Sequence, residues 1–186
     1  AEPVATDEAP VRLYVLREGV WRDFDNWPPS GSNATSYFLH SAGRANSLAG
    51  DGTLDTKPPD DELADVYTYD PVAPQPGLGG HSCCFENVAP MGPADQFQRE
   101  INNGVLIYTS VPLTEPLWLI GDVSATIYGA TTAVDTDYTV RLCVVDGAGV
   151  STNIQEGIVR ARYRESLSNP TLLEPGEIYR YEIPLG

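Results

Sequence analysis

Residues 137–145, DYTVRLCVV, decide the fold class, because apolar and polar side chains alternate along them. A period of two is the pattern of a half-buried strand, and the apolar face here carries Tyr138, Val140, Leu142 and Val144. An amphipathic helix would need apolar residues at i, i+3, i+4 and i+7, and no long stretch of the chain keeps that spacing. The sequence therefore predicts an all-β protein.

Short apolar segments separated by Gly, Pro, Asn and Asp lie on both sides of this stretch. We expect strands at 11–17, 37–40, 66–69, 105–110, 117–129, 157–164 and 176–185, the fifth of which turns a corner near Gly121. About nine or ten strands with irregular connections favour an antiparallel β-sandwich or jelly roll, with a barrel as the alternative. A length of 186 residues suggests one domain, so we expect a single sandwich over 1–186.

Two long segments, about 41–65 and 70–95, interrupt the strand pattern and are rich in Gly, Pro and Asp. Loops of this length inside a compact domain are usually functional or packed against a partner. We therefore expect them to be insertions with a role beyond connecting strands.

The composition excludes several classes of partner. A formal net charge of -15 and a pI near 4.2 argue against binding to nucleic acid or to an anionic membrane. No run of roughly 18 apolar residues is present, so we expect no transmembrane helix. Three cysteines (Cys83, Cys84 and Cys143) do not suggest a disulfide framework. Reduced thiols favour the cytoplasm, although a stable secreted domain also fits.

Local motifs do not support catalysis by this chain. GHSCC at 80–84 is the nearest stretch to the G-x-S-x-G nucleophile elbow, but it lacks the second glycine. No strand pattern precedes it and no helix pattern follows it. Ser82 would be the nucleophile of that motif, and Cys83 or Cys84 near His81 would offer a thiol, but neighbours along the chain rarely present each other with usable geometry. We therefore predict no catalytic residue in this chain.

Metal ligands are also few. His40 and His81 are the only histidines, and neither has a partner at helical or hairpin spacing. Asp135 and Asp137 could coordinate calcium with loop carbonyls, but such a pair more often caps a turn at the start of a strand. We expect no metal site and no cofactor.

Four stretches, in this order, resemble one family. They are VRLYVLREGVWRDFDNWPP (11–29), GPADQFQREINNGVLIYTSVPLTEPLWLIGDVSATIY (92–128), AVDTDYTVRLCVVDGAG (133–149) and EGIVRARYRESLSNPTLLEPGEIYRYEI (156–183). They resemble the C-terminal, non-catalytic domain of the X-Pro dipeptidyl-peptidase and cocaine-esterase group of α/β serine hydrolases. The resemblance covers nearly the whole chain.

This resemblance implies a jelly-roll β-sandwich of the galactose-binding type. It implies a parent chain with an α/β-hydrolase domain, a Ser-His-Asp triad and a helical cap, acting on a small ester or peptide substrate. The domain would pack on the hydrolase and cap domains and stabilise the enzyme, and it could support a homodimer. A loop after Gly79 and Gly80 would line the substrate pocket, with Cys84 and Phe85 at the place of the family's Leu-Phe pair. Here that loop carries one extra residue.

The chain departs from the family at its end. The family usually continues past the strand at 176–185 with another apolar segment, and this chain stops at Gly186. We therefore expect a fragment that lacks its last strands, which would leave open sheet edges.

Arg160, Arg162 and Arg164 alternate along the predicted strand 157–164, which places them on one face. Like charges in a row need nearby anions, which neighbouring strands of this acidic domain could supply. The resemblance offers another use, docking of the hydrolase domain through bidentate pairs with carboxylates.

A different class of function remains open at this stage. Jelly rolls of this type often bind sugars, so the chain could be a free-standing carbohydrate-binding module. Its ring-stacking residues would be Trp21, Trp27 and Trp118. The first two lie within the family's opening motif, where a structural role is the alternative.

Overall fold

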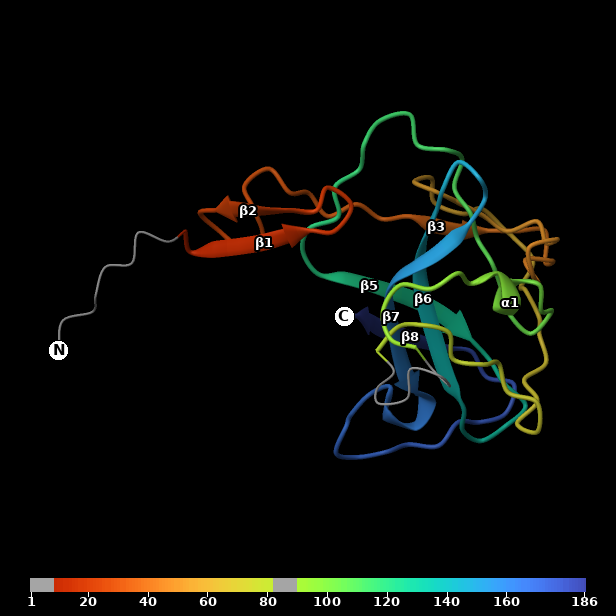
Figure 1. Cartoon of the computed structure of the whole chain (residues 1–186). Helices are drawn as coiled ribbons and strands as arrows, with labels where there is room; N and C mark the ends of the chain where they lie inside the picture. Colours follow the sequence, from red (N-terminus) through yellow and green to blue (C-terminus); the bar gives the residue numbers. More distant parts are fainter. Residues whose placement is uncertain (1–8, 82–89) are drawn as a thin grey trace. The chain divides into compact units, whose positions relative to one another are not determined.

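A computed structural model of the chain describes residues 9–81 and 90–186 (Figure 1). Within those residues the regular structure is almost entirely strand. The elements are β1 (Val11–Val15), β2 (Val20–Phe24), β3 (Phe38–His40), β4 (Thr53–Asp55), α1 (Phe97–Glu100), β5 (Val123–Gly129), β6 (Asp137–Val145), β7 (Ser151–Arg160), the 3-10 turn η1 (Ala161–Tyr163) and β8 (Tyr179–Leu185).

The strands pair as antiparallel ribbons: β1 with β2, β3 with β4, β5 with β8 and β6 with β7. The prediction of an all-β protein is confirmed. Its finer part, a jelly roll of the galactose-binding type, stays a prediction, as does a single sandwich over 1–186.

The chain divides into two compact units. The first comprises Ala1–Ser36 and Leu113–Gly121, and its described part holds the β1–β2 hairpin. Charged and aromatic pairs line that hairpin: Arg12 binds Asp23 at 2.6 Å, and the rings of Tyr14 and Trp21 lie 5.3 Å apart. The second unit comprises Tyr37–Pro112 and Asp122–Gly186 and contains the other three ribbons.

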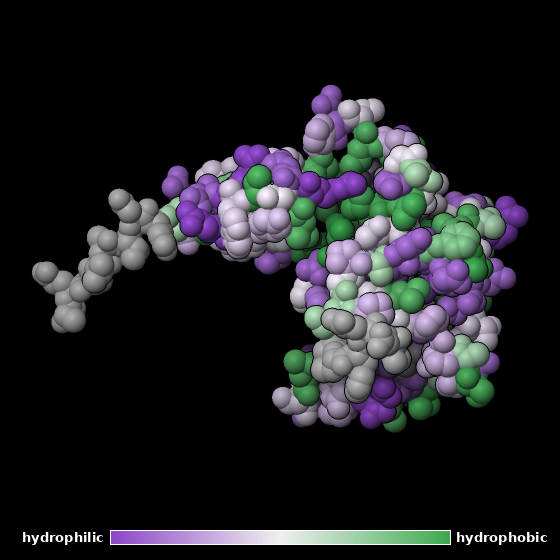
Figure 2. Space-filling view, in the orientation of Figure 1, coloured by the Kyte–Doolittle hydropathy of each residue, from purple (hydrophilic) through white to green (hydrophobic). Residues whose placement is uncertain are grey.

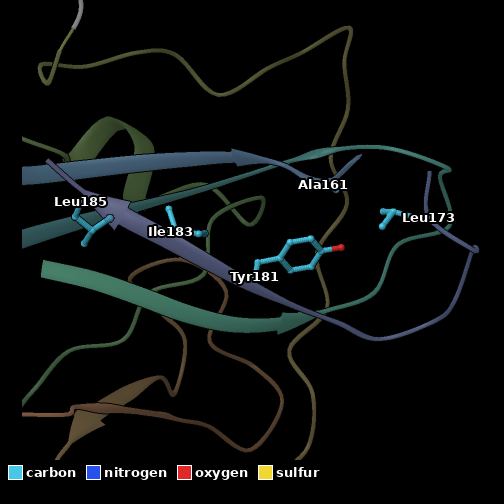
Figure 3. Packing of buried hydrophobic residues seen from close by; sticks show 5 residues of the cluster. All are labelled: Ala161, Leu173, Tyr181, Ile183 and Leu185. Atoms are coloured by element: carbon cyan, nitrogen blue, oxygen red, sulfur yellow. The ribbon is translucent and has the colours of Figure 1, made fainter. Parts of the chain in front are cut away.

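The hydrophobic core of the second unit lies between the β5–β8 and β6–β7 ribbons. Its fully buried members come mainly from β8 and the chain that follows β7: Ala161, Leu173, Tyr181, Ile183 and Leu185 (Figure 3). The inward faces of β5 and β6 complete it with Val123, Ile127, Tyr138, Val140 and Leu142. The alternation in 137–145 therefore predicted the correct inward face of β6.

A close approach of two strands explains the glycine at position 157. A Cβ there would lie 2.0 Å from the carbonyl oxygen of Pro184 on β8, so only glycine fits. The absence of a side chain at Gly157 therefore lets β7 pack closely against β8.

Three predicted strands differ from the structure. The strand predicted at 157–164 ends at Arg160, where η1 begins and the Arg164 amide donates back to the Ala161 carbonyl at 3.2 Å. Residues 105–110 make only isolated bridges, at Leu106 and Thr109, and 66–69 form no strand. The predicted corner near Gly121 is present, with φ +124°, and β5 starts two residues later.

The visible surface mixes hydrophilic and hydrophobic side chains (Figure 2). In the described part of the chain, no helix combines the length and apolar character needed to cross a membrane.

Candidate functional site

Two short stretches of backbone, 78–81 and 92–94, form the stems of the segment that joins them. The Gly80 amide donates to the Gly92 carbonyl at 2.8 Å, and the Gly92 amide donates back at 3.0 Å. Residues 82–89 between the stems lie outside the described residues. The predicted pocket residues Cys84 and Phe85 fall there, together with the candidates Ser82 and Cys83.

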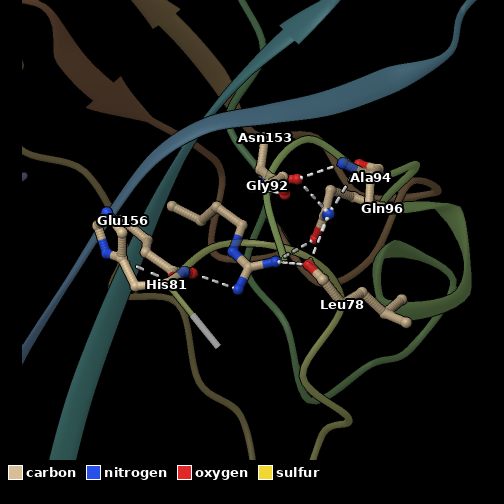
Figure 4. A network of polar contacts seen from close by, with 8 residues as sticks. Leu78, His81, Gly92, Ala94, Gln96, Asn153 and Glu156 are labelled. Atoms are coloured by element: carbon tan, nitrogen blue, oxygen red, sulfur yellow. Dashed lines mark hydrogen bonds and ion pairs between the residues drawn. The ribbon is translucent and has the colours of Figure 1, made fainter. Parts of the chain in front are cut away.

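Arg141 on β6 connects the first stem to the β6–β7 ribbon. Figure 4 labels its partners Leu78, Gln96 and Glu156. Its guanidinium donates to the carbonyl of Leu78, to Oε1 of Gln96 at 2.7 Å and to the carboxylate of Glu156. Arg141 and Glu156 are register partners across the ribbon. The side chain of Arg141 is only 17% exposed, so this is a largely desolvated ion pair.

The carboxylate of Glu156 uses both oxygens. One accepts from Arg141, and the other accepts from the His81 amide at 2.6 Å. Burial alone would raise the pKa of Glu156, but the His81 amide and the Arg141 guanidinium favour the anion more strongly, and the pKa lies below its ordinary value. Glu156 therefore remains an acceptor at neutral pH and fixes the end of the first stem.

Two buried amides complete the arrangement. Oδ1 of Asn153 accepts from the Ala94 amide at 2.8 Å, and its Nδ2 donates to the Gly92 carbonyl at 3.2 Å. Nε2 of Gln96 lies 3.1 Å from the Leu78 carbonyl, 2.9 Å from the Ala94 carbonyl and 3.0 Å from Oδ1 of Asn153. We call Arg141, Glu156, Gln96 and Asn153 the stem network.

The glycine pair in the first stem is required by this packing. Gly80 has φ +80°, and a Cβ on it would lie 2.0 Å from Oε1 of Glu156. Gly79 has φ +67°, and its Cβ would lie 2.4 Å from the Gly92 carbonyl. Left-handed backbone and absent side chains are both properties of glycine, so these positions admit no other residue without strain.

The three arginines predicted on one face are separated by η1. Arg160 and Arg162 both bind Asp135, with Nε–Oδ2 distances of 2.8 and 2.6 Å. Arg160 also lies 3.2 Å from Asp137. Arg164 turns inward: its side chain is 6% exposed, and its guanidinium lies 4.3 Å from the ring centre of Tyr179. The common face was wrong for Arg164, because the chain leaves the strand period at Ala161.

The acid pair considered for calcium is occupied by these guanidinium groups. Burial alone would raise the pKa of Asp135, but hydrogen bonds from Arg160 and Arg162 outweigh it and hold the pKa below its ordinary value. Within residues 9–81 and 90–186, no group of three His, Cys, Asp or Glu side chains is arranged to hold a metal ion.

The remaining predicted candidates are not members of the stem network. The His81 ring is 64% exposed, with Nδ1 3.8 Å from Glu156. Cys143 is a half-buried free thiol on β6, and burial raises its pKa. Trp118 has the guanidinium of Arg22 4.7 Å from its ring centre, and Trp21 packs on Tyr14, so each of these two rings already has a partner.

The stem network was not predicted from the sequence. Its members come from β6, β7 and the residue before α1, and they are far apart in the sequence. One local signal was available: a Gly-Gly pair indicates backbone that another group approaches closely.

Comparison with known proteins gives a family. The chain matches the model of the X-Pro dipeptidyl-peptidase C-terminal non-catalytic domain over residues 3–186. It is similar to cocaine esterase of Rhodococcus sp. (strain MB1 Bresler), with 43% identity over 175 residues. That match covers 94% of this chain and 30% of the esterase.

Solved structures agree with this assignment. An α-amino acid ester hydrolase superposes with a TM-score of 0.80 at 25% identity, over 96% of this chain and 31% of that one. An aminopeptidase from a marine sediment Thaumarchaeota archaeon gives a TM-score of 0.77 at 25% identity, over 97% and 30%. The chain therefore spans about 30% of the length of each of these relatives.

Proposed function

Because the chain belongs to the X-Pro dipeptidyl-peptidase C-terminal non-catalytic domain family, we propose that it serves a serine ester or amide hydrolase as an accessory domain. In this role it stabilises the parent enzyme and lines the substrate pocket with the loop after Gly79 and Gly80. The chemistry itself belongs to the parent's hydrolase domain. The substrate class is a small ester or peptide.

The stem network is the observation that carries this proposal. A loop that contributes to a pocket must leave its domain at fixed points, because the position of its side chains depends on where it starts and ends. The stems at 78–81 and 92–94 are tied to each other by backbone hydrogen bonds and to β6 and β7 by side chains that are buried or half-buried.

The docking surface for the hydrolase and cap domains includes Arg160 and Arg162. Their side chains are 48% and 36% exposed, and a guanidinium presents five donors, of which the acids here use only some. Arg164 is not part of this surface, because its side chain is buried. A partner carboxylate would complete the pairing of these two arginines.

The pocket role is tested in the full-length hydrolase that carries this domain. Phe85→Ala removes the aromatic ring predicted to contact the substrate, and KM for an ester substrate should rise roughly 10-fold with kcat little changed. Cys84→Ser, which nearly preserves side-chain size, is the milder companion variant. An unchanged KM in Phe85→Ala would contradict the pocket role.

The accessory role is tested with the isolated chain. It should not hydrolyse an activated ester such as a nitrophenyl acetate above the background rate. Ester cleavage that Ser82→Ala abolishes would overturn the assignment of a non-catalytic domain. Binding of oligosaccharides in a glycan array, lost in Trp27→Ala, would instead favour the carbohydrate-binding function.

A further inference from the structure

An irregularity in the β6–β7 ribbon explains why one strand supplies two residues of the stem network. Leu142 pairs with Gln155, and the next residue of β6, Cys143, pairs with Asn153. Ile154 is therefore the extra residue of a β-bulge.

The bulge changes which side chains point the same way. In a regular strand, side chains three positions apart lie on opposite faces. One extra residue between Asn153 and Glu156 brings both onto the same face, where Asn153 binds Ala94 and Glu156 binds His81. The second stem and the first stem are thus held by the same strand.

The opposite strand contributes the connection between the two contacts. Arg141 lies between Val140 and Leu142, both of which pack on the core, so its side chain points to the other face. There it binds Glu156 directly and Gln96 at 2.7 Å, and Gln96 in turn contacts Asn153. The four side chains form one continuous chain of hydrogen bonds across the bulged ribbon (Figure 4).

We propose that Glu156 and Asn153, linked by Arg141 and Gln96, are positioning residues that set the substrate specificity of the parent hydrolase. They fix the two stems at 78–81 and 92–94 and thereby the place from which the pocket loop projects. This inference rests on the proposed function. It assigns the positioning of the pocket loop to buried and half-buried residues that do not touch the substrate.

Glu156→Gln is the first test. The His81 amide and the Arg141 guanidinium donate to different oxygens of Glu156, and glutamine replaces one of these oxygens with an NH2 group that only donates, so both contacts cannot be kept in place. In the full-length hydrolase, hydrogen exchange of the His81 amide should accelerate roughly 10-fold, because a released hydrogen bond opens more often. KM for a substrate that reaches the loop should rise roughly fivefold, with kcat within about twofold of wild type.

A second variant guards against a folding defect. Arg141→Met combined with Glu156→Leu removes both charges and leaves neither buried alone, which is usually tolerated in a core. It deletes the acceptor for His81, so it should reproduce the faster exchange and the higher KM in a folded enzyme. Glu182→Gln is the control: it breaks an exposed pair with Arg180 on β8 and should change neither quantity.

The outcomes separate this inference from the proposed function. If Phe85→Ala raises KM while both stem variants keep wild-type KM and exchange, the positioning role is wrong and the pocket role stands. If Phe85→Ala leaves KM unchanged, the pocket role fails, and the specificity claim fails with it. Faster His81 exchange together with a raised KM in both stem variants supports the inference.

Discussion

Two segments of the second unit are held at their base by polar side chains, but only one of the two sets of side chains includes a histidine. The stem network holds the stems at 78–81 and 92–94 with a guanidinium, a carboxylate and two amides. Residues 62–65 are held instead by His40 and Ser41 at the end of β3. His40 binds Glu62, and Ser41 binds Asp65. We call these four residues the histidine clasp.

The protonation of His40 follows from its neighbours. Its Nδ1 lies 2.7 Å from Oε1 of Glu62, and its Nε2 lies 3.1 Å from the Lys57 carbonyl and 3.3 Å from Oδ1 of Asp55. Carboxylate and carbonyl oxygens only accept hydrogen bonds, so both ring nitrogens must carry hydrogen. His40 is therefore a cation in this arrangement.

The presence of a histidine in the clasp, and its absence from the stem network, determines which of the two segments responds to pH near neutrality. A guanidinium stays charged throughout the accessible range, and the pKa of Glu156 is lowered, so none of the four stem groups changes protonation near neutrality. A histidine does change there. The four side chains of the stem network include no histidine, although the exposed His81 ring lies 3.8 Å from Glu156 at the edge of the network. The histidine clasp contains His40 and weakens as the solution becomes basic.

The largest expected effect comes from breaking the stem network at its charged pair. Arg141→Met leaves the Glu156 carboxylate largely desolvated without its cation. We expect the chain to lose about 3–5 kcal/mol of unfolding free energy, measured by urea denaturation followed by circular dichroism. Arg180→Met, which breaks an exposed pair, should have no measurable effect. A loss in Arg141→Met under about 1 kcal/mol would show that the pair contributes little to the fold.

The glycine pair provides the next largest effect. Gly80→Ala places a Cβ on Glu156 and forces alanine to φ +80°, and we expect a loss of about 2–4 kcal/mol in the same assay. Gly149→Ala is matched in backbone, with φ +84°, but has no described atom within 4 Å of the added Cβ. It should lose only about 1–2 kcal/mol, the cost of the backbone alone. Equal losses in the two variants would remove the close approach of Glu156 as a cause.

The same comparison shows what the sequence could predict. β6 was predicted because apolar residues alternate along its sequence, and Tyr138, Val140 and Leu142 of that set pack on the core. Arg141 could be placed on the opposite face by the same alternation, but its burial depends on the stems, which fold over it from a distant part of the chain. Burial of one side chain by a remote segment does not change the alternation of apolar and polar residues along the strand.

The bulge limited the prediction on β7. An extra residue at Ile154 shifts the period, so Asn153 and Glu156 do not look like one face in the sequence. The strand predicted at 157–164 extended past Arg160 because the alternation of side chains continues through Tyr163 in the sequence, whereas the chain forms η1 from Ala161. Tertiary packing overrides local pattern in both cases.

A smaller effect is expected in the histidine clasp. The hydroxyl of Tyr108 donates to Oδ2 of Asp65 at 2.7 Å, and Asp65 also accepts from Ser41 and from the Ala45 amide. Tyr108→Phe removes one of these three bonds without changing shape, so we expect a loss of about 0.5–1.5 kcal/mol. Tyr69→Phe, at an exposed ring, is the control and should show no measurable loss. A neutral Tyr108→Phe would mean that solvent satisfies Asp65 equally well.

The smallest expected effect is the pH dependence of the stability that the histidine clasp contributes. The hydrogen bond with Glu62 raises the pKa of His40 above its ordinary value of about 6.5, and the same bond lowers the pKa of Glu62 below about 4.5. The His40 contribution is therefore complete below about pH 6.5 and is lost as pH rises through the higher folded pKa. The Glu62 contribution is complete above about pH 4.5 and is lost as pH falls through the lower one.

The clasp should accordingly be strongest between about pH 4.5 and 6.5 and weaken on the basic side. The urea midpoint of the wild-type chain should fall from about pH 6.5 to 9 relative to that of His40→Asn, whose amide does not titrate. NMR titration of the His40 ring should give a pKa above its ordinary value, lowered by Glu62→Gln and unaffected by Asp61→Asn. Parallel curves for wild type and His40→Asn would contradict this prediction. They would show that protonation of His40 contributes nothing to the stability of the segment at 62–65.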